Sequence, residues 1–351
     1  MQPIIPIDNQ HSYRSIQRNK DLKLTINNHC DLPSKYLVVD WRGNCFVCSC
    51  EAYLPISVGN ITDFTHLSDI WNSPMARWLQ TDIDQKKFTH CAVDRCGVLD
   101  RKQTVKDHIG GAGYCISINI DESCNLQCPS CRRDTIMWTQ GAEYDKKSAQ
   151  VNHLIQLLEQ FDQPAHIIMS GNGDPLASNI MRPFFHQWRP KHMHTIRLFT
   201  NGLLLKKQLT DNEIVDNITK YFISIDAGSA GIYHQVRRPG RWDILLKNFD
   251  FLKNLVQRTG AEVLLKFVLQ DTNRNDMKNF VDLCKIYGFK GVINRLEDWG
   301  TWDQYQEHDV VGNSQHRNYQ ETIINLKEVY QQEADLDHIQ FDASLRQIAT
   351  K

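Results

Sequence analysis

The chain has 351 residues, of which 41% are hydrophobic and 23% are charged, and its formal net charge is −1. This length and composition are typical of a globular enzyme built from two domains, or from one barrel with an extension. A nearly neutral chain has no global basic field for nucleic acid, and no apolar stretch reaches the roughly 18 residues that span a bilayer. Residues 1–14 carry prolines and polar side chains in place of a signal sequence, so we expect a cytoplasmic protein.

The first 112 residues are rich in cysteine and show little helix-length periodicity. They hold more than half of the cysteines of the chain, namely Cys30, Cys45, Cys48, Cys50, Cys91 and Cys96. In a reducing compartment, clustered cysteines are more often metal ligands than disulfides. The glycine-rich run at 110–113 predicts a junction. We therefore predict a cysteine-rich module at 1–112, an α/β domain at 113–300 and a helical extension at 301–351.

From residue 113 onward, short apolar runs alternate with helical patterns. Strands are predicted at 115–120, 166–169, 195–199, 221–225, 261–269 and 291–295, and helices at 146–161, 181–188, 211–219, 242–257 and 275–286. This alternation predicts a parallel sheet with right-handed crossovers. Six units fall short of the eight in a full TIM barrel, so we predict a partial (β/α)6 TIM-like barrel, with an open α/β sheet as the alternative. A packing helix is predicted at 319–330 in the tail.

Three cysteines follow the first strand of this region. Cys124, Cys128 and Cys131 have the spacing C-x3-C-x2-C. In both predicted architectures, sites lie at the carboxyl ends of the strands, where this loop begins. A [4Fe–4S] cluster usually takes four cysteines, so three thiolates would leave one iron open to another ligand. The alternative is a zinc site completed by a distant histidine or cysteine.

The cysteine loop in this strand context resembles the radical S-adenosylmethionine (SAM) family over residues 113–300. The resemblance implies a [4Fe–4S] cluster on the three cysteines, with SAM bound at the open iron and cleaved to a 5′-deoxyadenosyl radical. Segments at three further strand ends also resemble the family: 170–175, where Asn172 stands at a position that is often glycine, 200–202 and 224–227. By this resemblance the cofactor-binding residues are Gly171, Gly173, Asp174, Asn201, Ser224, Asp226 and Arg237.

The upstream cysteines resemble the auxiliary-cluster module called SPASM or twitch, which in the family usually follows the barrel and here precedes it. The resemblance implies a second, closed cluster, for which we choose Cys30, Cys48, Cys91 and Cys96. Cys45 and Cys50 are alternates to these ligands. The competing interpretation is a zinc ribbon built from Cys45, Cys48, Cys91 and Cys96.

These patterns leave three functional hypotheses. The first is a radical SAM enzyme that acts on a peptide or protein side chain, because the auxiliary module often accompanies peptide modification in related enzymes. The second is the same chemistry on a small molecule, a sugar or a nucleotide, and the third is a non-enzymatic zinc or iron–sulfur scaffold. An enzyme of this kind needs a flavodoxin- or ferredoxin-like reductant. Glu297 and Asp298, after the sixth strand, are candidates for substrate or base roles, or for simple helix caps.

Overall fold

The computed structural model describes residues 29–92, 96, 98–99, 113–170, 172–298, 300–333 and 338–350. They form two compact units: unit 1 consists of the chain up to Glu122 with Trp138–Arg197, and unit 2 of Ser123–Met137 with Leu198–Lys351. Gly113 is the one residue of the predicted 110–113 junction within the described part. The predicted domain boundaries at 112 and 300 stay predictions.

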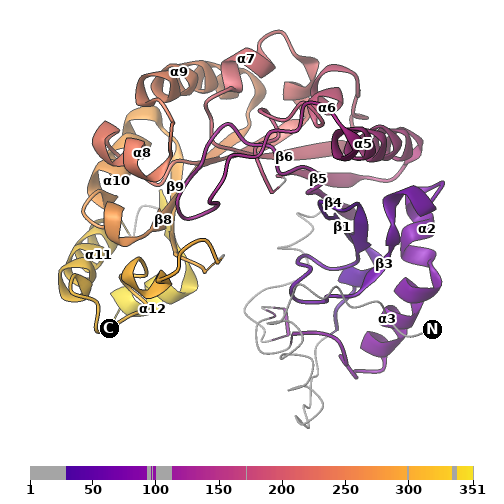
Figure 1. The fold of residues 1–351 in the computed structure, drawn as a ribbon, viewed down its shortest axis with the longest axis horizontal. Helices are drawn as coiled ribbons and strands as arrows, with labels where there is room; N and C mark the ends of the chain where they lie inside the picture. Colours follow the sequence, from indigo (N-terminus) through magenta and orange to yellow (C-terminus); the bar gives the residue numbers. More distant parts are fainter. Residues whose placement is uncertain are drawn as a thin grey trace. The chain divides into compact units, whose positions relative to one another are not determined.

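Unit 1 is built on a sheet with the strand order β5-β4-β1-β2-β3 (Figure 1). Strand β1 (Tyr36–Val39) runs parallel to β4 (Tyr114–Ile118), which runs parallel to β5 (Ala165–Met169), whereas β2 (Asn44–Phe46) and β3 (Ser57–Asn60) continue antiparallel from β1. The helices of this unit are α2 (Leu67–Asn72), α3 (Pro74–Asp84), α5 (Ala142–Gln160) and α6 (Arg182–His186), with short 3-10 turns at Leu32–Ser34 and Ile61–Asp63.

Helix α3 corrects the expectation that the N-terminal module has little helical structure. Ser73 caps it by accepting a hydrogen bond from the Ala76 amide (3.3 Å), and Pro74 occupies its first turn. Its buried face consists of Ala76, Leu79 and Ile83. The Ser73-Pro74 pair is therefore the sequence signal for the start of this helix.

Strand β6 (His194–Thr200) is divided between the units, and unit 2 continues with the order β7-β8-β9-β10. Strands β7 (Ile218–Ser224), β8 (Glu262–Leu269), β9 (Lys290–Arg295) and β10 (Ile339–Phe341) are all parallel. The helices are α7 (Leu205–Leu209), α8 (Ala230–Val236), α9 (Trp242–Thr259), α10 (Met277–Tyr287), α11 (Tyr319–Glu333) and α12 (Ala343–Ala349), with 3-10 turns at Glu213–Asn217, Asp271–Asn273 and Tyr305–Glu307. Helices α8 to α11 lie on one side of β8 and β9 (Figure 1).

The six predicted strands correspond to β4 to β9, so the α/β class expected of a partial (β/α)6 barrel is confirmed. The helix predicted at 211–219 is a 3-10 turn at Glu213–Asn217, because Asp211 has a left-handed backbone (φ 54°) that ends any helix there. The amide of Ile214 then donates to the Asn212 side chain at 3.2 Å, which starts the short turn. None of the described helices has the length and apolar character needed to cross a membrane.

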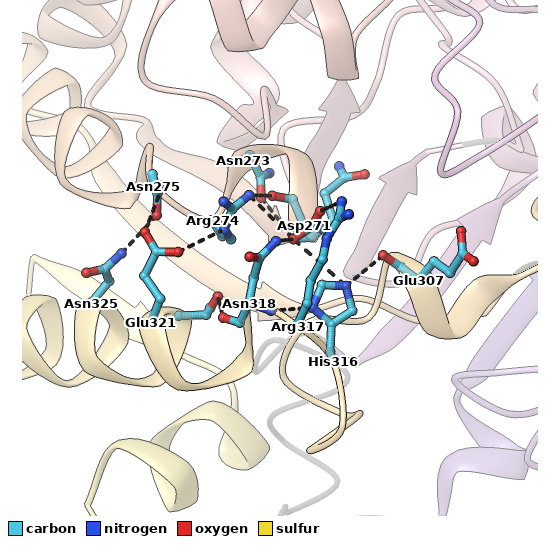
Figure 2. Close-up of polar contacts among 12 residues, drawn as sticks. Asp271, Asn273, Arg274, Asn275, Glu307, His316, Arg317, Asn318, Glu321 and Asn325 are labelled. Carbon is cyan, nitrogen blue, oxygen red and sulfur yellow. Dashed lines mark hydrogen bonds and ion pairs between the residues drawn. The ribbon is translucent and has the colours of Figure 1, made fainter.

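A polar network holds the tail helix α11 against the loop after β8 (Figure 2). Asp271, in the 3-10 turn after β8, accepts from the Asn318 side chain at 2.8 Å and lies 3.4 Å from Arg274 Nη1 and 3.9 Å from His316 Nε2. Arg274 also lies 3.7 Å from Glu321 on α11 itself. Together with the buried Leu326, these contacts confirm that the tail contains a packing helix.

Gly228 offers a sharp test of packing in unit 2. A Cβ atom on this residue would lie 2.0 Å from the Phe280 nitrogen and 2.2 Å from the Asn279 carbonyl carbon, both in the backbone of α10. We expect Gly228→Ala to lower the free energy of unfolding by about 1–3 kcal/mol, as overpacking does. Gly231→Ala, where a Cβ meets nothing within 4 Å in helix α8, should instead raise it by up to about 1 kcal/mol. Urea unfolding of both variants, followed by circular dichroism, tests this, and equal midpoints would contradict it.

Candidate functional site

The three-cysteine loop is shaped by its own backbone within unit 2. The amides of Cys131 and Arg132 both donate to the Cys128 carbonyl, at 2.9 and 3.1 Å, which makes a tight turn between the last two cysteines. The Cys124 amide donates to the Ile136 carbonyl at 2.9 Å and closes the base of the loop. Cys128 is buried, Cys124 is half-buried and Cys131 is exposed. The three thiols thus run from the interior of the unit to its surface.

Side chains from two later segments, one directly after β6 and one at the end of α8, contact this loop. Asn201, directly after β6, donates to the Asn125 side chain at 2.8 Å and approaches the Cys124 sulfur at 4.0 Å. Arg237, at the end of α8, donates from Nη1 to the Cys128 sulfur at 3.7 Å. Predicted site residues after the strands β6 and β7 are therefore brought to the cysteine loop, as the strand-end rule leads one to expect.

Asp226 holds Arg237 in place. Its Oδ2 lies 2.6 Å from Arg237 Nη2, and its Oδ1 accepts from the Val268 amide at 2.8 Å. Both carboxylate oxygens are therefore used inside unit 2. Asp226 also has a left-handed backbone with φ of 51°, a conformation that costs energy for a residue with a side chain. In this arrangement Asp226 acts on the site through Arg237.

Opposing electrostatic effects act on the Cys128 thiol. Burial raises the pKa of this thiol, and the adjacent Arg237 charge acts in the opposite direction. Although burial alone would lower it, the pKa of Arg237 is raised by Asp226 and by the Cys128 sulfur, so the guanidinium stays charged. The Leu126 amide also donates to the Cys124 sulfur at 3.4 Å. Donors that face ligand sulfurs stabilise their negative charge and tune a bound cluster.

These observations fit a [4Fe–4S] cluster on Cys124, Cys128 and Cys131. Three cysteines share one loop, and N–H donors face the sulfurs of Cys124 and Cys128. Within the described ranges, no group of three or more His, Cys, Asp or Glu side chains is arranged to hold a single metal ion. A cluster makes a different demand, because each thiolate binds its own iron.

The remaining predicted cofactor residues lie elsewhere. Gly171 is outside the described residues, and Gly173 and Asp174 belong to unit 1. Asp174 is 3% exposed, and its Oδ1 accepts from the Leu176 amide at 3.0 Å. Ser224 ends β7 and is half-buried. The roles of these residues in cofactor binding stay predictions.

The four upstream cysteines chosen as ligands, Cys30, Cys48, Cys91 and Cys96, lie close together in unit 1. A buried cluster that includes Phe46, Cys96 and Cys115 has Cys30 and Cys91 packed against it. Burial raises the pKa of Cys30 to about 11 and that of Cys48 to about 12, and neighbouring thiols add to both shifts. The pKa of Cys91 is raised by burial and then by the thiols of Cys48, Cys30 and Cys96. The four chosen thiols therefore lie close enough to sense one another.

Cys45 differs from these four. Neighbouring residues of a strand point to opposite faces of a sheet, and Cys45 precedes Phe46 on β2. Phe46 pairs with Val38 and lies in the buried cluster of the cysteine face, whereas Cys45 pairs with Val39. Burial raises the pKa of Cys45, followed by the carboxylates Asp40 and Asp63, with no thiol among the causes.

The sequence analysis overlooked one charged residue of this region, Lys266 on β8. Burial lowers its pKa, whereas the charge of Asp226 acts in the opposite direction. Lys266 pairs across the sheet with Ser224, at the strand end that carries the predicted site residues. The signal that could have revealed it is a lysine in the middle of the apolar strand Glu262–Leu269.

Comparison with known proteins adds two kinds of similarity. Residues 30–97 match SPASM, described as an iron–sulfur cluster-binding domain. The AdoMet-dependent heme synthase of Nitratidesulfovibrio vulgaris is 22% identical over 174 residues, which cover 49% of this chain and 45% of that protein. The chain therefore aligns with less than half of this curated relative.

Among solved structures, the SuiB protein of Streptococcus suis bound to its precursor peptide SuiA has a TM-score of 0.41 and 12% identity, covering 77% of this chain and 62% of SuiB. The anSMEcpe protein with bound AdoMet and the Cp18Cys peptide has a TM-score of 0.42 and 15% identity, covering 65% of this chain and 62% of that one. Residues 30–97 are therefore similar to the SPASM iron–sulfur cluster-binding domain, and about half of the chain is similar to an AdoMet-dependent heme synthase.

Proposed function

We propose that the protein cleaves SAM reductively at a [4Fe–4S] cluster held by Cys124, Cys128 and Cys131. When bound, that cluster supplies the electron that converts SAM to a 5′-deoxyadenosyl radical, which abstracts hydrogen from a substrate. The observation that carries the proposal is the cysteine loop itself, with Asn201 and Arg237 donating toward the sulfurs of Cys124 and Cys128. A purely structural cluster is usually closed by four cysteines, whereas this loop supplies three and leaves one iron open.

The residues around the cysteine loop would bind and orient SAM. Asp226 and Arg237 form a buried ion pair beside Cys128, which fixes the guanidinium near the sulfur. We propose that Asn201, Ser224 and Arg237 contact SAM on the side of unit 2, with Asp226 positioning Arg237. Gly171, Gly173 and Asp174 would hold the amino group of SAM, since a carboxylate and glycine carbonyls suit an ammonium.

We propose that Cys30, Cys48, Cys91 and Cys96 hold a second, closed cluster. The mutual effects of these thiols on one another's pKa support this set. We further propose a reducing compartment such as the cytoplasm, in which clustered cysteines serve as metal ligands. A flavodoxin- or ferredoxin-like protein would deliver the electrons.

The substrate that we propose is a peptide or protein side chain. The SPASM domain supports this, because it often accompanies peptide modification in the family that the chain resembles. The alternative substrate is a small molecule such as a sugar or nucleotide.

Anaerobic reconstitution with iron and sulfide tests the central claim. The protein should bind about eight irons per chain if both clusters are cubanes. After reduction it should release 5′-deoxyadenosine from SAM, measured by liquid chromatography. A protein that binds zinc without acid-labile sulfide, or that never cleaves SAM when fully loaded, would overturn the proposal.

A further inference from the structure

A cavity of about 470 Å³ lies in unit 2, between the end of helix α7, the 3-10 turn at Glu213–Asn217 and the second half of helix α9 (Figure 1). Its apolar walls are formed by Leu209, Val215, Phe251 and Leu255. This volume falls in the range of roughly 300–1,000 Å³ that is usual for ligand pockets. No cysteine is among the described residues that line it.

The cavity is remote from the cysteine loop. Its lining residues precede β7 and β8 in the chain, so it lies at the edge of the sheet where these two strands begin. The cysteine loop is reached from Asp226, just after the carboxyl end of β7, through Arg237. Strand β7 has seven residues, so about 20 Å separates the two edges. The cavity is therefore a second site, independent of the proposed cluster.

The polar lining of the cavity is acidic. It contains the carboxylates of Asp211, Glu213 and Asp216 and one guanidinium, that of Arg258. Arg258 Nη1 donates to Asp216 Oδ1 at 2.9 Å, and both side chains are more than half exposed. Three carboxylates against one guanidinium leave two negative charges in excess. A concave surface with such an excess attracts cations.

A buried hydroxyl points toward this lining. Tyr221 on β7 is 0% exposed, and among the described residues its hydroxyl has no hydrogen-bond partner. Burial raises the pKa of this hydroxyl, and the next effects on it come from Arg258 and Asp216, both of which line the cavity. A buried polar group without a partner is costly, so we expect a group that enters the cavity to bond it.

We propose that this cavity binds the side chain of a lysine that belongs to a peptide or protein partner. The aliphatic stem of a lysine suits the apolar walls, and its ammonium group suits the acidic lining. The ammonium has donors only, so it supplies what the Tyr221 hydroxyl and the carboxylates accept. Because the cavity is larger than one side chain, residues that flank the lysine also have room to enter.

An arginine suits the same cavity less well. A guanidinium binds most strongly to both oxygens of one carboxylate, and Arg258 already occupies one oxygen of Asp216. The three donors of an ammonium rotate freely and share no plane. They can therefore bond the second oxygen of Asp216 and the Tyr221 hydroxyl at the same time.

Methyl NMR of the anaerobically purified full-length protein tests the site without SAM and without turnover. The probe is the tripeptide acetyl-Ala-Lys-Ala-amide, which should shift the methyl resonances of Leu209, Val215 and Leu255 in a saturable manner. Two matched peptides carry norleucine or arginine in the central position. The norleucine peptide, which has the stem without the charge, should give no saturable shift. The arginine peptide should bind more weakly than the lysine peptide.

The variant Tyr221→Phe removes only the hydroxyl. Since this hydroxyl has no partner among the described residues, the variant should fold as the wild type does. Its affinity for the lysine peptide should fall by about tenfold, the loss expected for a hydrogen bond to a charged group. Asp282→Asn is the matched control, because it removes an exposed carboxylate of helix α10 outside the cavity and should leave the affinity unchanged.

Several results would overturn the proposal. They are equal binding of the norleucine peptide, tighter binding of the arginine peptide, the same methyl shifts with magnesium chloride alone, or an equal loss of affinity in Asp282→Asn. Full affinity in a folded Tyr221→Phe protein would overturn it as well. If Tyr221→Phe does not fold, the three peptides on the wild type decide. Binding of the lysine peptide by a protein that never cleaves SAM would contradict only the proposed function.

Discussion

Replacing Cys128 by alanine should abolish SAM cleavage and lower the iron content from about eight to about four per chain, the loss of one cubane. Cys128 is the buried member of the loop, and the Arg237 guanidinium faces its sulfur at 3.7 Å. Without the thiolate, one iron loses its ligand and the paired Arg237 faces a cavity. Iron and sulfide analysis, together with the yield of 5′-deoxyadenosine, measures both effects.

Cys284→Ala is the matched control for this change. Cys284 is buried in helix α10, remote in sequence from both cysteine groups, and burial raises its pKa. This variant should retain about eight irons and full SAM cleavage. A Cys128→Ala protein that keeps all of its iron and still releases 5′-deoxyadenosine would refute the assignment of the loop.

The barrel strands could be predicted because each is a short apolar run between turn residues, a pattern that depends on nearby sequence alone. The position of Asn201 beside the cysteine loop could also be expected, because parallel strands end at one edge of a sheet. Arg237 follows helix α8 and was expected only from the family resemblance. The contacts of Asp226 could not be predicted in this way. Its ion pair and its bond to Val268, 42 residues away, depend on the packing of neighbouring elements.

The surroundings of charged residues inside strands could not be predicted from the sequence. Alternation along a strand predicts which residues share a face, but it does not say whether the polar face meets water or the interior. Arg197 and Lys266 both interrupt apolar strands. From the sequence alone, each would be interpreted as a solvated charge on an outward face. Their surroundings, which set their chemistry, come from side chains on other strands.

In the N-terminal module, too, the sequence alone does not say which side of the sheet each cysteine faces. The cysteine spacing of residues 45–50 left Cys45, Cys48 and Cys50 as competing ligands. The register of β1 against β2 sets Cys45 apart, because it places Phe46 with Val38 on the cysteine face and turns Cys45 to the other. Cys48 and Cys50 follow β2, so this register does not choose between them. A pairing between two strands decides that orientation.

Replacing Cys91 by alanine should therefore remove the second cluster and leave the first. The thiols of Cys30, Cys48 and Cys96 all act on the pKa of Cys91, which places it among them. We expect Cys91→Ala to retain about four irons and the ability to release 5′-deoxyadenosine, since the loop at Cys124 is untouched. Formation of the modified substrate should fall sharply, because we propose that the auxiliary cluster relays an electron to or from the substrate radical.

Cys45→Ala separates the cluster from the competing zinc ribbon. Both sites would use Cys48, Cys91 and Cys96, but the ribbon needs Cys45 and the cluster needs Cys30. If the cluster is present, Cys45→Ala keeps about eight irons and Cys30→Ala keeps about four. If the ribbon is present, the wild type holds zinc in this module, Cys45→Ala loses it and Cys30→Ala does not. The face that β2 assigns to Cys45 favours the first result, because a thiol on the opposite side of the sheet would have to cross the strand to reach the other three.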